Sequence, residues 1–369
     1  MKNVELMVIG GGPAGLCAAI KAAELGVSVL LVERDRWLGG QLVKQTHMFF
    51  GSEKQHAATR GIDIAKLLID KIEAMENIEV IKNATVLGIY EDGIITIEGE
   101  GKYQKIKPKA VIVATGASEK TLAFPKNDLP GIYGAGAVQT LMNVYGVKPG
   151  QRVLMVGAGN IGLIVTYQLM QAGVHVEAII EGAPKIGGYL VHASKIRRMG
   201  VPIYTSYTVK EAEGENDLEE VTIWRLDEGW NPIPGTEIRL DVDVICVSVG
   251  LTPLSELLWQ AGCKMQFVTA LGGFVPIRDE EMQTSVKGIF VAGDVAGVEE
   301  ASSAMVEGQL AGLSAASYLG YTVYNIKEIK QDLLHQLQAL RSGPVGEKIR
   351  QGISEIIASK EVAAAAEGL

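Results

Sequence analysis

Two glycine-rich segments have the residue spacing needed to bind a nucleotide phosphate. Residues 10–15 read GGGPAG and residues 157–162 read GAGNIG, 147 residues later, so both match the pattern G-x-G-x-x-G. In such a loop the first glycine makes a tight turn and the second lets a pyrophosphate approach the backbone. The third glycine lets the following helix pack closely on a strand. The helix N-terminus then presents partial positive charge and free N–H groups to the phosphates.

The motif is weak alone, so the flanking elements decide its meaning. Each loop lies between an apolar run and a helical pattern, and each is followed by a second apolar run that ends in a glutamate. The predicted strand, helix and strand are residues 6–9, 16–25 and 27–32 for the first unit and 153–156, 163–171 and 174–180 for the second. Glu33 and Glu181 are the terminal glutamates, placed to accept hydrogen bonds from ribose hydroxyls. The sequence therefore contains a duplicated dinucleotide-binding unit.

The second loop allows more than one ligand. The residues predicted to contact its nucleotide are Gly157, Gly159, Asn160, Ile161, Gly162 and Glu181. A carboxylate at the strand end favours a free 2′-hydroxyl and repels a 2′-phosphate, so NAD(H) is preferred to NADP(H). Two alternatives stay open: a retained fold that no longer binds nicotinamide, and a site that holds an adenine nucleotide structurally.

The remaining elements complete an α/β chain. Residues 80–97 alternate like strands, with Asp92-Gly93 as a hairpin turn, and residues 110–114, 242–249 and 289–294 are further predicted strands. A helix is expected around residues 308–319, and a helical tail beyond residue 326 is interrupted near Ser342-Gly343-Pro344. The expected fold is two Rossmann-like three-layer domains, the second inserted in the first. The expected boundaries are 1–118 with 251–325, then 119–250, then a tail at 326–369.

Composition excludes several classes of partner. The formal charge of −9 and the pI near 5.3 disfavour nucleic acid and anionic membranes. The three cysteines, Cys17, Cys246 and Cys263, form no C-x-x-C pair, cluster ligand set or zinc site. No run of 18 apolar residues suggests a membrane span, and the early first strand leaves no room for a signal peptide, so a cytoplasmic protein without a bound metal is expected.

Three further segments extend the motif to a family resemblance. They are Gly39-Gly40-Gln41-Leu42, Ala114-Thr115-Gly116 and Ala292-Gly293-Asp294. Together with the glycine loops, over roughly residues 4–320, they resemble the two-dinucleotide-domain flavoproteins of the thioredoxin-reductase type. The resemblance implies FAD in the first domain. The residues it assigns to FAD are Gly10, Gly12, Pro13, Ala14, Gly15, Glu33, Arg34, Gly40, Gln41, Thr46, Val86, Thr115, Gly116, Gly293 and Asp294.

Two departures separate this chain from thioredoxin reductases. It lacks their C-x-x-C, and Glu181-Gly-Ala-Pro stands where they carry arginines for a 2′-phosphate. The segments at residues 131–143 and 293–312 instead look like the α subunits of heteromeric dehydrogenases and oxidases, namely dye-linked proline dehydrogenase, hydrogen cyanide synthase and heterotetrameric sarcosine oxidase. This likeness implies a hetero-oligomer whose other members are a β flavoprotein and a small iron–sulfur protein.

No catalytic set follows from the sequence. His47, His56 and Arg60 lie in a polar insertion that the resemblance places near the flavin, where they orient an acidic substrate or partner, or simply form a surface loop. Phe49-Phe50 is either a partner contact or packing. The leading prediction is an FAD-dependent oxidoreductase that transfers electrons as the α subunit of an amino-acid or secondary-amine dehydrogenase. The alternatives are a stand-alone NADH-dependent flavin reductase and a nucleotide-regulated scaffold with structural FAD.

Overall fold

The computed structural model describes residues 1–49, 51–322 and 324–367. It divides into two compact units, one formed by residues 1–118 and 252–369 and the other by residues 119–251. The chain is a mixed α/β protein with parallel sheets and a helical C-terminal tail, which confirms the predicted fold class. The segments that leave and re-enter the first unit, β7 (Ala117–Glu119) and β16 (Leu251–Pro253), pair with each other.

The first unit is built on a sheet whose parallel strands end at the glycine loop. Strand order is β3-β2-β1-β6-β5-β4, and β19 pairs with the C-terminal half of β6. The bounds are β1 (Lys2–Ile9), β2 (Val29–Val32), β3 (Ile78–Ile81), β4 (Ala84–Ile89), β5 (Ile95–Gly99), β6 (Lys102–Val113) and β19 (Ile289–Val291). Strands β1, β2, β3, β6 and β19 are mutually parallel, so their carboxyl ends lie along one edge.

The antiparallel part of this sheet contains the predicted hairpin. Strands β4 and β5 pair antiparallel, with a turn at Asp92-Gly93 between them. The Asp92 carboxylate accepts a hydrogen bond of 2.9 Å from the Ile94 N–H, and Gly93 adopts a φ of 72°. Aspartate followed by glycine favours such a turn, because the carboxylate accepts a nearby backbone N–H and glycine tolerates positive φ.

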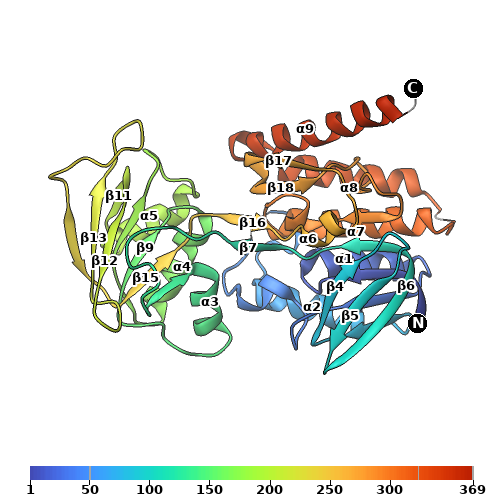
Figure 1. Cartoon of the computed structure of the whole chain (residues 1–369), viewed down its shortest axis with the longest axis horizontal. Coiled ribbons are helices and arrows are strands. Elements are labelled where there is room, and N and C mark those ends of the chain that lie inside the picture. The colour runs from blue at the N-terminus through green and yellow to red at the C-terminus, as the bar shows by residue number, and fades with distance from the viewer. Residues whose placement is uncertain (50, 323, 368–369) are drawn as a thin grey trace. The chain divides into compact units, whose positions relative to one another are not determined.

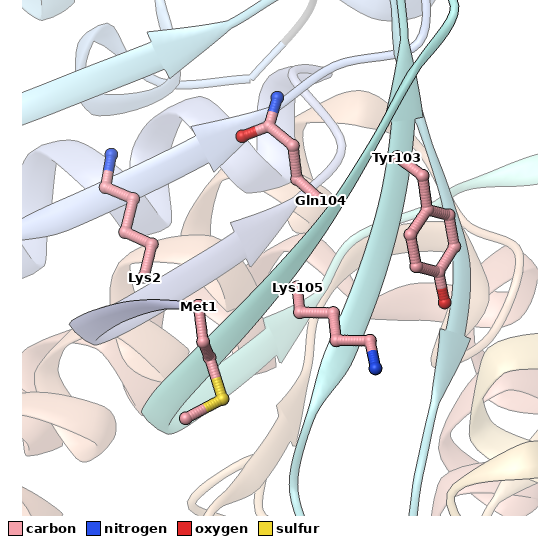
Figure 2. Close-up of a pocket in the computed structure, with 5 residues that line it drawn as sticks. All are labelled: Met1, Lys2, Tyr103, Gln104 and Lys105. Atoms are coloured by element: carbon pink, nitrogen blue, oxygen red, sulfur yellow. The ribbon is translucent and has the colours of Figure 1, made fainter.

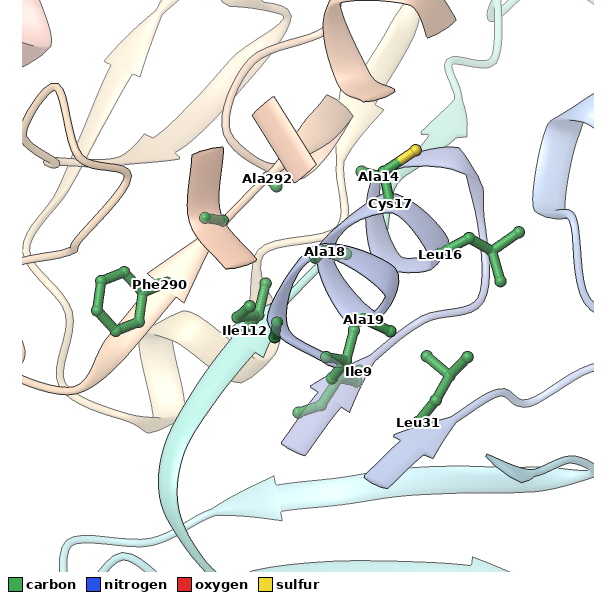
Figure 3. Close-up of a cluster of buried hydrophobic side chains, with 14 of the residues drawn as sticks. Ile9, Ala14, Leu16, Cys17, Ala18, Ala19, Leu31, Ile112, Phe290 and Ala292 are labelled. Atoms are coloured by element: carbon green, nitrogen blue, oxygen red, sulfur yellow. The ribbon is translucent and has the colours of Figure 1, made fainter. Parts of the chain in front are cut away.

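Helices α1 (Pro13–Glu24) and α7 (Ala301–Tyr318) pack on each other, although they lie almost 300 residues apart in the chain (Figure 1). Their contact surfaces are made of small residues. A Cβ atom on Gly308 would overlap the Ala14 carbonyl, and one on Gly312 would overlap the Ala18 carbonyl. The absence of these Cβ atoms lets the two backbones approach closely. Figure 3 shows Ala14, Cys17 and Ala18 of α1 beside Ile9, Ile112 and Phe290 of the sheet.

The first unit contains further helical elements, and the last two of them form the C-terminal tail. They are the 3₁₀ turns η1 (Gly40–Lys44), η2 (Glu53–Gln55), η3 (Thr269–Leu271) and η4 (Gly293–Val295), and the helices α2 (Gly61–Glu73), α6 (Glu256–Gln260), α8 (Ile326–Leu340) and α9 (Gly343–Glu367). The hairpin β17 (Met265–Val268) and β18 (Gly273–Pro276) packs against α9 through Val268, Val275 and Ile356. Leu333 and Leu337 of α8 are buried in the main core, so the tail is an integral part of this unit.

The second unit has the three layers expected of a nucleotide-binding fold. Its central parallel sheet has the order β11-β10-β9-β15-β8. The strands are β8 (Ile132–Gly134), β9 (Arg152–Val156), β10 (His175–Glu181), β11 (Ile203–Thr205) and β15 (Val244–Val247). One apolar cluster joins this sheet to the helices α3 (Ala135–Asn143), α4 (Asn160–Gln171) and α5 (Leu190–Arg198). A second cluster joins its other face to the antiparallel strands β12 (Tyr207–Glu213), β13 (Glu220–Arg225) and β14 (Ile238–Asp241).

Candidate functional site: two glycine cradles

The first glycine loop connects β1 to α1. At two of its glycines a side chain would overlap the backbone, and at a third it would occupy open space. Gly10 has a φ of 105°, and a Cβ there would overlap the Ala114 carbonyl oxygen at the end of β6. A Cβ on Gly15 would overlap the carbonyl oxygen of Gly10. Gly12 is different, because the nearest described atom to its Cβ position is the Gly40 Cα at 3.9 Å. Gly10 and Gly15 therefore shape the loop, while Gly12 faces free space.

The N-terminus of α1 lies directly behind this space. Gly12 is the N-cap residue, it provides no side-chain capping hydrogen bond, and Pro13 occupies the first turn. Proline at this position needs no N–H partner, and the neighbouring N–H groups point along the helix axis toward the loop. A phosphate beside Gly12 would satisfy these donors and interact favourably with the helix dipole.

Glu33 connects the loop to the end of β2. Its buried carboxylate accepts hydrogen bonds from the Gly11 N–H at 2.6 Å and from the Asp35 N–H at 2.8 Å. Each oxygen still has lone pairs available after these bonds, as a ribose hydroxyl requires. Arg34 follows Glu33 with an exposed side chain. The Glu33 carbonyl accepts the Ala84 N–H at 3.0 Å, which brings β4 and its Val86 to the same end of the sheet.

The turn η1 lies against the loop through Gly39 and Gly40. The Gly39 N–H donates to the Gly11 carbonyl at 2.8 Å, and a Cβ on Gly40 would lie 2.7 Å from the Gly12 Cα. Both Gly39 and Gly40 have positive φ. Gln41 is exposed at the start of η1, and Thr46 follows η1 in the half-buried coil.

The remaining residues assigned to FAD come from the ends of β6 and β19. The Thr115 hydroxyl donates to the Leu254 carbonyl at 2.7 Å, and no described atom lies within 4 Å of a Cβ on Gly116. Gly293 has a φ of 75° and lies against α1, since its Cβ would be 2.8 Å from the Ala14 Cβ. The structure thus gathers residues from four parallel strand ends around one glycine loop. Direct contact of these residues with FAD remains a prediction.

A buried charge cluster that no sequence pattern predicted lies next to Asp294 and consists of Arg278, Glu299, Glu307 and Arg341. The Glu307 carboxylate accepts the Gly293 N–H at 3.0 Å and contacts an Arg278 Nη at 3.2 Å and an Arg341 Nη at 2.6 Å. Arg341 also contacts Glu299 at 2.7 Å. These partners lie far apart in sequence, so no local pattern reveals them.

The pKa of Asp294 is raised mainly by burial, and the carboxylates of this cluster add to the rise. Burial raises the pKa of the Asp294 carboxyl to about 7, although a hydrogen bond from the Glu299 backbone N–H opposes the rise, and the negative charges of Glu307 and Glu299 add to it. A carboxyl group that is protonated near neutrality can donate as well as accept hydrogen bonds. Such a group suits a polyhydroxyl chain, which offers both donors and acceptors.

The second glycine loop repeats the first. Gly157 has a φ of 107° and would overlap the Ser248 carbonyl if it carried a Cβ, while a Cβ on Gly162 would overlap the Gly157 carbonyl. Within the described part of the chain, nothing lies within 4 Å of a Cβ on Gly159. Glu181 accepts the Ala158 N–H at 2.9 Å and the Ala183 N–H at 3.0 Å, as Glu33 does in the first unit.

The repeat also includes a glycine pair, residues 187–188, that the predicted motifs did not include. The Gly188 N–H donates to the Ala158 carbonyl at 2.9 Å, and a Cβ on Gly188 would lie 2.9 Å from the Gly159 backbone carbon. The Asn160 side chain accepts the next N–H, from Tyr189, at 2.8 Å. Ile161 is exposed in the first turn of α4. The sequence does contain a pattern that could have revealed this pair, because a glycine pair begins six residues after the glutamate in both units.

The burial of the cysteines and the arrangement of the possible metal ligands among the described residues bear on redox and metal chemistry. Cys17, Cys246 and Cys263 are all buried. Burial raises the pKa of Cys17 to about 12 and also raises the pKa of Cys246 and Cys263. Among the described residues no group of three or more His, Cys, Asp or Glu side chains is arranged to hold a metal ion. The described helices include none that is long and apolar enough to cross a membrane.

The first unit has two further features, an aromatic pair and a surface depression. Phe49 is buried and stacks on His47 with 5.7 Å between ring centroids, so Phe49 serves packing, while Phe50 lies outside the described residues. An open surface depression is lined by Met1, Lys2, Tyr103, Gln104 and Lys105 (Figure 2). These residues lie at the amino ends of β1 and β6, away from the carboxyl ends that form the glycine loop.

Several proteins of known function that resemble this chain are named as parts of larger enzymes. The chain is 27% identical to the A subunit of opine oxidase from Agrobacterium tumefaciens, with 85% of this chain and 66% of the relative covered. It is 28% identical to the HcnB subunit of hydrogen cyanide synthase from Pseudomonas protegens (85% and 70% covered) and 28% identical to the alpha subunit of sarcosine oxidase from Corynebacterium (90% and 34% covered). The chain thus spans between a third and 70% of the length of these relatives.

Solved structures share the fold. L-proline dehydrogenase from P. horikoshii is 25% identical with a TM-score of 0.70, covering 90% of this chain and 59% of that one. Thioredoxin reductase from T. acidophilum is 25% identical with a TM-score of 0.71, covering 86% of this chain and 99% of that one. A family model for pyridine nucleotide-disulphide oxidoreductases matches residues 4–308. With two glycine cradles and this match over most of its length, the chain belongs to the pyridine nucleotide-disulphide oxidoreductase family and is an FAD-dependent oxidoreductase.

Proposed function

We propose that this chain is the electron-transferring α subunit of an amino-acid or secondary-amine dehydrogenase complex. The observation that supports this role best is its likeness to three proteins named as subunits of an opine oxidase, a hydrogen cyanide synthase and a sarcosine oxidase. The substrates we propose for the complex are amino acids or secondary amines. The proposed partners are a β flavoprotein, where the substrate is oxidised, and a small iron–sulfur protein.

The first cradle fits the cofactor that this role needs. Gly12 leaves room for a pyrophosphate, and Glu33 has lone pairs for the adenosine ribose. Asp294 follows Gly293, which lies against Ala14 of α1, and would hydrogen-bond the ribityl chain. Bound FAD would supply two-electron acceptance and delivery. The residues of the chain would hold it, and the N-terminus of α7 would favour negative charge at the flavin ring through its dipole.

The buried cysteines favour this role over disulfide reduction. A dithiol reductase needs two adjacent thiols, at least one of them accessible as a thiolate. The chain has three cysteines at widely separated positions, all buried and with raised pKa. Electrons must therefore leave the flavin directly, either to another protein or to a diffusible acceptor.

The test compares the chain alone with the chain co-expressed with its neighbouring genes. Dye reduction is measured with proline, hydroxyproline, sarcosine and glycine. We expect turnover only in the co-purified complex, with bleaching of the flavin by the same substrate. Turnover by the isolated chain at about 1 per second or faster would show that the chain holds the substrate site itself and would refute the α-subunit role.

A second candidate function, NADH-dependent flavin reduction, is favoured by the intact second cradle. Glu181 would lie close to a 2′-phosphate, and like charges at that range cost several kcal/mol at about 4 Å and intermediate dielectric. If the site binds a nicotinamide nucleotide, NADH should reduce the flavin more efficiently than NADPH. Titration of flavin absorbance with each nucleotide tests this. Equal or better efficiency with NADPH would contradict the role of Glu181. No response to either nucleotide would favour a retained fold that no longer binds nicotinamide, or a site that holds an adenine nucleotide structurally.

A further inference from the structure

A tryptophan from a distant hairpin lies beside the second cradle. Trp230 belongs to the turn between β13 and β14, and its indole contacts the residue that follows Glu181. A Cβ on Gly182 would lie 2.7 Å from Cζ3 and 3.3 Å from Cη2 of Trp230. Despite this contact, Trp230 remains 61% exposed. The ring therefore abuts the cradle with most of its surface available to a ligand.

The turn holds this tryptophan in an unusual conformation. Trp230 has a φ of 63°, a region that bulky L-residues rarely adopt. The Asp227 carboxylate accepts the N–H groups of Gly229 and Asn231, both at 2.8 Å, and so fixes the turn on both sides of Trp230. Backbone strain that the surrounding contacts maintain is a reason to look for a function of the strained residue.

The chemistry of a nucleotide indicates what Trp230 would contact. Glu181 marks the position of the adenosine ribose hydroxyls. The adenine base is attached to the ribose carbon next to the one that bears the 2′-hydroxyl, so the base must lie within a few ångströms of Glu181. Gly182 and the indole against it are the groups at that position. An indole presents a flat aromatic face on which a purine can stack.

We propose that Trp230 is the stacking surface for the adenine base of a nucleotide held by the second cradle. The inference rests on the proposed second nucleotide site and deepens it by naming the base-recognition residue. The ligand class is an adenine nucleotide with a free 2′-hydroxyl. Recognition of the base at Trp230 requires no nicotinamide, so AMP should bind through the same contact as NAD⁺.

The experiment measures equilibrium binding to the FAD-loaded protein by calorimetry. The probes are AMP, NAD⁺ and nicotinamide mononucleotide, which lacks adenine. Stacking of one base is worth about 5- to 150-fold in affinity, so Trp230→Ala should weaken AMP and NAD⁺ by that factor and leave nicotinamide mononucleotide within about twofold. Trp230→Phe keeps an aromatic face and should retain most of the affinity. Trp259→Ala removes another exposed tryptophan, in the first unit, and should change nothing.

A second variant tests whether the probes occupy this cradle. Gly159→Val adds a side chain where no described atom lies within 4 Å, so the protein should fold but exclude the phosphate, and all three probes should lose binding.

Unchanged AMP affinity in Trp230→Ala, or no AMP binding to the wild-type protein, would overturn the inference. Flavin absorbance is recorded on the same samples. A wild-type protein without FAD would count against the proposed function, whereas an FAD-loaded protein with unchanged AMP affinity would overturn only the role of Trp230.

Discussion

At the scale of single residues, the two cradles differ from ordinary tight turns at the middle glycine of each loop. Gly12 and Gly159 have backbone conformations open to any residue and face free space, unlike Gly10 and Gly157, whose φ is positive and whose Cβ would overlap a carbonyl. Packing of the protein does not require glycine at positions 12 and 159. A pyrophosphate held against the backbone, as we propose for each loop, would require it.

This difference predicts a pair of matched variants. Gly12→Val should fold but lose FAD, because the added methyl groups occupy the space predicted for the pyrophosphate. Gly159→Val should fold and keep FAD, because the change lies in the other unit. Flavin absorbance per mole of protein and the thermal unfolding midpoint measure the two properties. A yellow Gly12→Val protein with normal flavin content would refute the assignment of the first loop.

Asp294 gives a pH dependence at the same scale. Its pKa is raised to about 7 in the folded chain, above its ordinary value of 3.8, so the folded state binds the proton more tightly than the unfolded state. The free energy of unfolding should therefore fall as the pH rises from about 4 to about 7.

The matching variant isolates this effect. Asp294→Asn cannot ionise, so in FAD-free protein it should match the wild type near pH 4 and exceed its stability by up to roughly 4 kcal/mol at about pH 8. Urea unfolding at about pH 4.5, 6 and 8 brackets this titration and measures the difference. Asp128→Asn, at an exposed position, serves as the control. A stability difference that does not vary with pH would show that Asp294 ionises normally.

At the scale of elements, the tail helix α8 is connected to the rest of the first unit by two kinds of ion pair. Arg341, at its C-terminal end, is almost buried between Glu299 and Glu307. Lys54 pairs with Asp332 of the same helix at 2.7 Å, but both side chains are more than half exposed. Removal of one partner from a buried pair leaves an uncompensated charge, whereas an exposed pair contributes little.

Arg341→Met should therefore lower the free energy of unfolding by about 3–5 kcal/mol. Lys54→Met, which breaks a pair on the same helix, should lower it by about 1 kcal/mol or less. Urea denaturation of both variants gives the comparison. Similar small losses for the two would mean that Glu299 and Glu307 tolerate the missing guanidinium, for example by protonation, and the buried cluster would then not anchor the tail.

Sequence patterns predicted the elements that depend on neighbouring residues. The glycine loops, the strands on either side of them and the Asp92-Gly93 hairpin follow from local conformational preferences. The Arg341–Glu307 pair and the Trp230–Gly182 contact do not, because tertiary packing joins residues 34 and 48 positions apart. The glycine pair at 187–188 was not predicted, although the sequence contains a pattern that could have revealed it. Its spacing from Glu181 repeats the spacing of residues 39–40 from Glu33.

At the scale of the whole molecule, the positions of the cysteines limit the redox chemistry. All three are buried, with Cys17 in the core of the first unit and Cys246 in that of the second. We expect the native protein to show no rapid reaction with a chromogenic aromatic disulfide such as Ellman's reagent, and the unfolded protein to show three thiols. A native thiol that reacts within seconds and changes the flavin spectrum would be evidence that a cysteine takes part in electron transfer.

The pair between Arg341, which follows α8, and Glu307, which accepts the Gly293 N–H, has a consequence for biosynthesis. Glu307 is buried under a strand end predicted to contact the cofactor, and one of its two arginine partners, Arg341, follows 34 residues later. A nascent chain that has emerged from the ribosome only to the end of α7 contains Arg278 but lacks Arg341, so the cluster is incomplete. Cofactor loading should therefore be delayed until α8 has emerged and docked, and a translational pause before that point would prolong the lifetime of an apo intermediate.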